Sequence, residues 1–351
     1  MKLNKIASFV SLCLLLPTSV QAIQVAGDKL EIYGKIHMSV DSSDTDGATT
    51  TDGFSVSSNS SRVGFKGQLP AGGVKFVYQF EQEVRFDDSS KGTFASRNSF
   101  VGMKGGFGKI IVGIHDTPFK TVGSKWGVFG DSVGERRAIL GAGYLDGNQL
   151  NERVKNAIMY EYKNDSIKFQ ALYAVEPEGA SGSVDNNDKK VTSLGLLGKF
   201  GGFRLGAAYE SWDNHSKIAN GDATRLSLGY KFGFGTIGAI WENIDSDTVA
   251  QWKRDVIGVN AKIKVGKNSD IRVQYLEADD ADGTTDTGAS KVSIGYFHKM
   301  DKKLQLYAAY GATDNDANAD FKAVDGGHGD EVGGPVGGNP SSVSVGMIYK
   351  F

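Results

Sequence analysis

The sequence contains a single cysteine, Cys13, and that residue lies in a segment typical of a secretory signal peptide. Two lysines precede an apolar run over residues 6–16, and a site of small residues predicts cleavage after Ala22, so that residues 1–22 are the signal peptide. The predicted mature chain, residues 23–351, therefore has no cysteine, which excludes a fold held by disulfides. An exported chain of this length requires an extended framework of hydrogen bonds instead.

Proline and long apolar runs are also scarce. The chain has 6 prolines against 47 glycines, and no mature stretch reaches the roughly 18 apolar residues that a membrane helix needs. So much glycine would be costly in helices, and it favours many strands joined by glycine turns. Any membrane-spanning part must therefore be built from strands.

An excess of charge of one sign is missing as well. The formal net charge of the chain is −2, and the loss of the two lysines of the signal peptide takes it to −4. This mild balance indicates neither a nucleic-acid-binding protein nor a strongly polyanionic one.

What the sequence does contain is alternation with a period of two residues, from one end to the other. In the stretch "KLEIYGKIHMSVD" at residues 29–41, the apolar residues share one face and the polar residues share the other. The same pattern returns in "SRVGFKGQL", in "VKFVYQFEQEVRF" and in many later stretches. Alternation of this kind predicts strands with one apolar face and one polar face.

The connections between these strands are of two kinds, which alternate along the chain. Seven are short and turn-like: 70–73, 105–108, 163–166, 201–202, 233–235, 266–269 and 300–302. Eight are long and polar: 42–60, 87–96, 116–152, 176–190, 213–222, 244–254, 278–289 and 312–340. Fifteen connections predict an all-β fold, a sixteen-stranded antiparallel transmembrane barrel with short periplasmic turns and long external loops. No boundary between domains is visible, so residues 23–351 are predicted to form one barrel domain.

The polar face supports closure around water, because a soluble sandwich would need an apolar inner face. The charged residues that share the inward parity are Lys35, Arg62, Lys66, Glu81, Glu83, Arg97, Lys168, Arg225, Lys262 and Arg272. Aromatic residues near strand ends suit the girdles at the two membrane interfaces. These are Tyr78, Phe80, Tyr160, Tyr162, Tyr173, Tyr209, Tyr230, Phe232, Tyr296, Tyr310 and Tyr349.

The final stretch, "SVSVGMIYKF", alternates to the last residue, Phe351. In lipid an unpaired strand edge is costly, so the final strand is expected to pair with the first and close the barrel.

By its order of motifs the mature chain resembles the general bacterial porins, the trimeric sixteen-stranded family of Gram-negative outer membranes. The stretches that carry the resemblance are "YGKIHMSVD", "SSRVGFKG", "VYQFEQE", "RNSFVGMKGGFGKIIVG", "RVKNAIMYEY", "SIGYFHKMDKKLQLYAAYG" and "VGMIYKF". The resemblance implies a water-filled channel for passive diffusion of ions and small hydrophilic solutes, with no enzymatic activity and no cofactor. It also implies a homotrimer in contact with outer-membrane lipid and lipopolysaccharide, and a carboxy-terminal signal, Tyr349 and Phe351, for the outer-membrane assembly machinery.

The resemblance further implies that the third external loop, here residues 116–152, folds inward and narrows the lumen. The positions that match the family's basic wall are Lys35, Arg62, Arg97 and Arg153. The loop would oppose them with Asp131 and Glu135, and the other lumen candidates are Glu81, Glu83, Arg85, His115 and Asp116. Opposed rows of fixed charge would create a transverse field across the aqueous gap.

Two departures from the family pattern leave the ion preference open. Ile114 stands where many relatives carry an arginine, which His115 could replace, and Arg136 and Arg137 place positive charge beside Glu135.

Three other functions compete with a passive channel. A sugar-selective pore would use aromatic residues along its path, and Trp126 lies in the loop that could provide one, whereas Trp212, Trp241 and Trp252 suit a girdle. An enzyme is disfavoured because the five histidines show no metal-like spacing and no nucleophile motif lies nearby. The glycine-rich segment 323–340 and the acidic segment 41–53 could hold a divalent cation, but solvated variable loops are the simpler interpretation.

Overall fold

A computed structural model of the chain describes residues 23–47, 53–87, 94–145, 147–179, 188–247 and 252–351. The predicted signal peptide, residues 1–22, lies outside the described residues. Within the described ranges no helix combines the length and the apolar character needed to cross a membrane.

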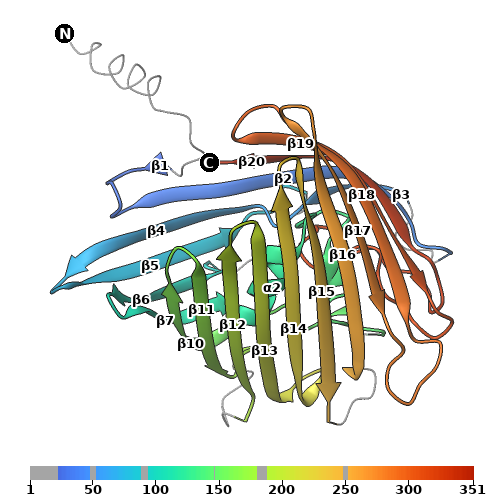
Figure 1. Cartoon of the computed structure of the whole chain (residues 1–351), viewed down its shortest axis with the longest axis horizontal. Coiled ribbons are helices and arrows are strands. Elements are labelled where there is room, and N and C mark those ends of the chain that lie inside the picture. Colours follow the sequence, from blue (N-terminus) through green and yellow to red (C-terminus); the bar gives the residue numbers. More distant parts are fainter. Residues whose placement is uncertain (1–22, 48–52, 88–93, 146, 180–187, 248–251) are drawn as a thin grey trace.

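Nearly all of the regular secondary structure in the described chain is antiparallel sheet (Figure 1). The strands are β1 (Ile23–Gln24), β2 (Glu31–Asp44), β3 (Gly53–Ser58), β4 (Arg62–Ala71), β5 (Val74–Glu83), β6 (Ser99–Gly105), β7 (Gly108–Asp116), β8 (Ala142–Gly143), β9 (Gly147–Asn148), β10 (Arg153–Lys163), β11 (Ile167–Val175), β12 (Lys190–Phe200), β13 (Phe203–His215), β14 (Ala219–Phe232), β15 (Gly235–Ser246), β16 (Arg254–Val265), β17 (Ser269–Ala278), β18 (Ala289–Lys299), β19 (Leu304–Asn315) and β20 (Ser341–Lys350). The helices are α2 (Pro118–Trp126) and the short 3₁₀ helix η2 (Arg136–Ala138).

The sheet closes into a sixteen-stranded barrel, as the sequence predicted. β3 and β4 form one barrel strand with an irregularity at residues 59–61, where Asn59 N–H donates to the carbonyl of His37. The last strand, β20, pairs with the first, β2, from Lys35 opposite Lys350 to Asp44 opposite Ser341 (Figure 1). Closure leaves no open edge in lipid.

The alternation predicted from the sequence sets the two faces of the wall. On β20, Val343, Val345 and Met347 are exposed on the outer surface, whereas Ser342 and Ser344 are buried on the lumen side. The same parity holds on β14, where Leu226 and Leu228 face outward and Arg225 faces inward.

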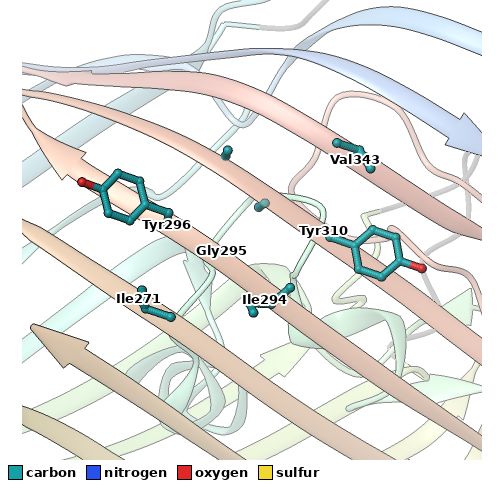
Figure 2. Close-up of a pocket in the computed structure, with 8 residues that line it drawn as sticks. Ile271, Ile294, Gly295, Tyr296, Tyr310 and Val343 are labelled. Atoms are coloured by element: carbon teal, nitrogen blue, oxygen red, sulfur yellow. The ribbon is translucent and has the colours of Figure 1, made fainter. Parts of the chain in front are cut away.

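The outer surface has a shallow apolar hollow of about 370 Å³ over β17, β18 and β19 (Figure 2). Ala308 lies opposite Tyr296 in the ladder, and its small side chain leaves this space open. The rings of Tyr296 and Tyr310 stand on either side of the hollow (Figure 2). Exposed tyrosines of this kind on the outer surface are typical of interfacial aromatic residues.

The seven short connections agree with their predicted positions, but one predicted long loop is wrong. β13 continues to His215 and β14 begins at Ala219, so the connection predicted over 213–222 is a tight turn. The imidazole of His215 accepts hydrogen bonds from the backbone N–H groups of Lys217 and Ile218, which stabilises the turn. The polar composition of this stretch reflects strand ends beyond the membrane rather than a loop.

Candidate functional site

The segment between β7 and β10 lies against the lumen face of the wall. Its helix, α2, begins with Pro118, and the Thr117 hydroxyl caps it by accepting from the N–H of Lys120 at 3.2 Å. The helix contacts β12, β13 and β14, and Figure 1 shows it behind those strands. The guanidinium of Arg225, on β14, stacks 3.9 Å from the centre of the Phe119 ring.

Beyond α2, side chains of the wall hold the backbone of the segment. Asn260 donates to the carbonyl of Trp126 at 3.1 Å, and Arg272 donates to that of Val128 at 2.7 Å. Gln274 donates to the carbonyl of Gly134 at 3.1 Å. The segment is therefore attached along its length to inward-facing residues of β16 and β17.

A polar cavity of about 510 Å³ remains beside this segment. Its charged lining consists of Arg62, Glu83, Arg85, Arg97, Asp116, Lys120, Asp131, Glu135, Arg136, Arg137, Arg153 and Glu331. The cavity thus brings together most of the predicted site residues. Seven basic and five acidic side chains line it, which leaves a net charge of +2 when His328 is neutral.

Two of the predicted wall arginines share a carboxylate. Arg97 Nε lies 2.8 Å from Glu81 Oε1, and its NH1 lies 3.1 Å from Glu83 Oε2. Arg62 Nε is 3.6 Å from the other oxygen of Glu81, and its side chain keeps 26% of its surface exposed. Arg62 is therefore less fully paired than Arg97 and is more available to a passing ion.

Arg153 belongs to a second network, at the start of the segment. Its NH2 lies 3.1 Å from Asp116 Oδ1, and Lys120 Nζ lies 2.8 Å from the same oxygen. Burial lowers the pKa of Lys120 to about 8, and the carboxylate of Asp116 opposes that shift. Lys120 was not among the predicted site residues, although its position four residues after Asp116 was a signal for this pair.

Asp131 and Glu135 of the segment are both paired with basic residues, Asp131 with one from the wall and one from its own segment. Asp131 lies 2.6 Å from Lys35 Nζ on β2 and 2.8 Å from Arg137 NH2. Glu135 is fully buried, with Arg136 NH1 at 2.5 Å and Arg137 Nε at 3.1 Å. The resemblance implied an acidic loop opposite a basic wall. Asp131 does lie against Lys35 of that wall, whereas Glu135 is paired with arginines of its own segment.

These pairs keep both carboxylates ionised. Burial alone would raise the pKa of Glu135, but the guanidinium groups of Arg137 and Arg136 lower it to about 2. Burial opposes ionisation of Asp131 too, yet Lys35 and Arg137 hold the pKa of Asp131 well below its usual range.

The last connection, between β19 and β20, also enters the lumen. Residues 326–331 line the cavity, and the segment is folded on itself by a bridge between Val324 and Val332. Gly329 N–H donates to Asn59 Oδ1 at 2.8 Å, and Ser57 donates to Asp330 Oδ2 at 2.9 Å. The interpretation of this stretch as a solvated loop is therefore wrong, because Ala323 and Val324 are fully buried.

Two further positions singled out from the sequence, His115 and Ile114, lie outside the cavity lining. His115 packs its ring 5.5 Å from that of Phe100, and its Nδ1–H donates to the carbonyl of Asp116 at 2.7 Å, outside the cavity lining. Ile114 shares the parity of the outward residues Ile110 and Val112.

The two terminal aromatic residues lie at the closing edge. Gly34 and Phe351 exchange backbone hydrogen bonds of 2.9 and 3.2 Å, and the ring of Phe351 lies over Gly34, where any Cβ would collide with it. The Tyr349 and Phe351 ring centres are 6.3 Å apart. Phe351 thus extends the seam between the first and last strands.

The tryptophans offer no aromatic path along the cavity. Trp126 is 7% exposed and packs against the wall beside Ile240 and Leu276. Trp212 and Trp252 are buried in the lumen-side packing, so the girdle role predicted for them is wrong.

Comparison with known proteins agrees with this architecture. The family model for Gram-negative porins matches residues 10–318. The chain belongs to the Gram-negative porin family. As a Gram-negative porin it resides in the outer membrane, with its short turns on the periplasmic side.

Relatives of this porin share moderate identity. It is 31% identical to the major outer membrane protein P.IB of Neisseria meningitidis serogroup A over 177 residues, 48% of this chain and 49% of the relative. It is 25% identical to the outer membrane porin protein 32 of Delftia acidovorans over 269 residues, 71% and 73% of the two chains. The chain spans about half the length of the neisserial relatives that it matches.

Solved structures share the fold. The anion-selective porin from Comamonas acidovorans superposes with a TM-score of 0.74 at 21% identity, covering 92% of this porin and 99% of that chain. The trimer form of OmpT from Vibrio cholerae gives 0.63 at 20% identity, covering 92% and 99%.

Proposed function

We propose that this porin forms a water-filled channel through which ions and small hydrophilic solutes diffuse passively. The barrel is closed, its inward face is polar, and a charged cavity lies beside the segment between β7 and β10. In this proposal residues 116–152 are the constriction loop, which narrows the lumen together with residues 326–331. Arg62, Arg97, Arg153 and Lys35 form its basic wall.

The observation that carries an ion preference is the charge of the cavity lining. Basic side chains of the lining outnumber acidic ones by two. The carboxylate of Glu135 is buried and paired with Arg136 and Arg137. A fixed positive charge in a narrow aqueous gap raises the local concentration of anions. The proposed channel therefore favours anions, as the structural neighbour from Comamonas acidovorans, an anion-selective porin, does by its name.

The proposal includes a homotrimer, which the trimer form of the structural neighbour OmpT supports. It also includes a cleaved signal peptide over residues 1–22 and a carboxy-terminal assembly signal at Tyr349 and Phe351. Lipid and lipopolysaccharide surround the apolar outer band. The proposed role is transport without covalent chemistry, so we assign it no catalytic residue and no cofactor.

The test is single-channel recording of refolded residues 23–351 in planar bilayers, with the reversal potential measured under a potassium chloride gradient. We expect large ohmic steps that close in threes and a reversal potential displaced toward that of chloride. Small currents blocked by a single sugar would indicate a substrate-specific channel instead. Absence of current from a folded barrel would contradict the channel itself.

A further inference from the structure

The lumen contains a second concentration of positive charge, at the end of the barrel where the short turns lie. Here lysines and arginines occupy inward positions on neighbouring strands directly opposite one another. Lys104 lies opposite both Lys75 and Lys109, Lys163 lies opposite Lys168, and Lys199 lies opposite Arg204. We call these seven residues the periplasmic basic ring.

Their inward direction follows from the alternation on each strand. On β6 the outward residues are Val101 and Met103, so Lys104 faces the lumen. On β12 and β13 the outward residues include Leu196 and Leu205, which places Lys199 and Arg204 inside. The ring therefore borders the aqueous lumen rather than lipid.

Acidic side chains compensate only part of this charge. Glu161 lies 3.1 Å from both Lys109 and Lys168, and Asp28 lies 3.8 Å from Lys75. Lys104, Lys163, Lys199 and Arg204 are exposed and form no ion pair with any residue that the structure describes. Four cations of the ring thus lack an anionic partner within the described chain.

Such an arrangement costs stability. Like charges directly opposite each other on neighbouring strands repel, because their Cβ atoms lie only about 5 Å apart. Ordinary sheet packing would place a polar or acidic residue at one position of each pair. A bound anion would reduce the repulsion within these repeated like-charge pairs.

We propose that the periplasmic basic ring is a binding site for small multivalent anions of the phosphate class, entered from the periplasmic side. Several ammonium and guanidinium groups converging on one aqueous mouth attract a multivalent anion more strongly than a monovalent one. The inference rests on the proposed channel function, since it needs an open lumen.

The external end of the lumen differs, and this difference gives the site its sidedness. Between that end and the ring, the segment between β7 and β10 and the residues around Gly329 pack inside the wall, held by hydrogen bonds from Asn260 to the carbonyl of Trp126 and from Gly329 N–H to Asn59. An anion arriving from outside must pass these packed segments before it reaches the ring. Binding from the periplasmic side is therefore favoured.

The experiment records single channels in bilayers of phosphatidylcholine, a zwitterionic lipid, with tripolyphosphate added to one side at a time. Because the mature chain has no cysteine, Ser166→Cys on a short turn marks the periplasmic side for an impermeant thiol reagent. We expect tripolyphosphate to reduce the current at concentrations about tenfold lower from the marked side than from the other.

The key variant removes three ring charges, Lys104→Gln, Lys199→Gln and Arg204→Gln together. The matched control removes three basic charges at the external end, Lys155→Gln, Lys217→Gln and Lys253→Gln. The ring variant should lose about tenfold in apparent affinity for tripolyphosphate, and the control should block as the natural sequence does. Equal block from the two sides, or an unchanged affinity in the ring variant, would overturn the proposal.

A second measurement needs no variant. Periplasmic block by tripolyphosphate should weaken when potassium chloride is raised from 0.1 to 1 M, because the Debye length falls from about 10 Å to about 3 Å. A block insensitive to salt would contradict an electrostatic ring. Normal ohmic current without any block would refute the ring while leaving the channel function intact, whereas absence of current would refute the channel.

Discussion

The middle of the lumen and its periplasmic mouth handle fixed charge in opposite ways. In the middle, where the segment between β7 and β10 packs against the wall, charges are buried and paired: Arg225 bonds Glu242 with both side chains fully buried, and Asp131 lies between Lys35 and Arg137. At the periplasmic mouth, cations such as Lys104 and Lys199 are exposed and oppose other cations. The difference shows that charged residues of one barrel wall hold the loops where the loops pack against it. Where water fills the lumen, the exposed cations are free to attract anions.

The largest expected effect concerns the attachment of the segment between β7 and β10 to the wall. Lys35→Met leaves Asp131 with Arg137 as its charged partner, and we expect a loss of about 1–3 kcal/mol in the free energy of unfolding. Urea titration of the refolded porin in detergent measures this quantity. Lys35→Arg, which keeps the charge, is the control and should recover most of the loss; an unchanged midpoint in Lys35→Met would show that the attachment contributes nothing.

The next effect concerns the charge of the polar cavity beside the segment between β7 and β10. Arg62→Glu takes the net charge of the lining from +2 to 0, so the ratio of chloride to potassium permeability should fall about threefold. The reversal potential under a salt gradient reports it. Lys155→Glu, the same change of charge at the external end, should move this ratio little, and an equal effect of both variants would place the selectivity outside the cavity.

A smaller effect is expected from pH. Lys120 has a pKa lowered to about 8, so its charge is present at pH 7 and is lost as the pH rises through 8 to 9. The lining then falls from +2 to +1, and anion preference should decrease by less than about twofold with a midpoint near pH 8. Reversal potentials measured from pH 6 to 9.5 test this, and Lys120→Gln should abolish the step near pH 8. Persistence of the step in that variant would assign it to another group.

The smallest effect tests the repulsion between cations at the periplasmic mouth. Lys199→Gln removes repulsion from Arg204 and should stabilise the barrel by about 0.2–0.5 kcal/mol. The same urea titration measures it, with Lys217→Gln as a control of equal charge. Destabilisation by Lys199→Gln would mean that the periplasmic cations are structurally paired.

The difference between the strands of the wall and the loops packed inside it explains which features could be read from the sequence. Strand alternation gave the inward direction of Arg62, Lys168 and Arg225, because a side chain on a strand can point only inward or outward. Closure of β20 on β2 followed from the cost of an open edge in lipid. The first inference required no knowledge of a distant contact. The second concerned a single distant contact, the pairing of the two terminal strands.

The loops could not be read in the same way. The burial of Glu135 under Arg136 and Arg137, and the position of Gly329 beside Asn59, join residues whose partners no local period specifies. Trp126 lay in the predicted loop, yet only the packing of that loop against β15 and β17 turned its ring to the wall.

The sequence by itself determined the barrel, its strand number, its seam and the inward parity of its charged residues, because these depend on a two-residue period and on the solvents at the two faces. The tertiary structure alone decided that Asp131 and Glu135 pair with arginines of their own segment and that the residues around Gly329 line the cavity. Those contacts form only once the closed wall offers the loops a polar interior. Local patterning therefore specifies the wall, and closure of the wall specifies where the loops pack.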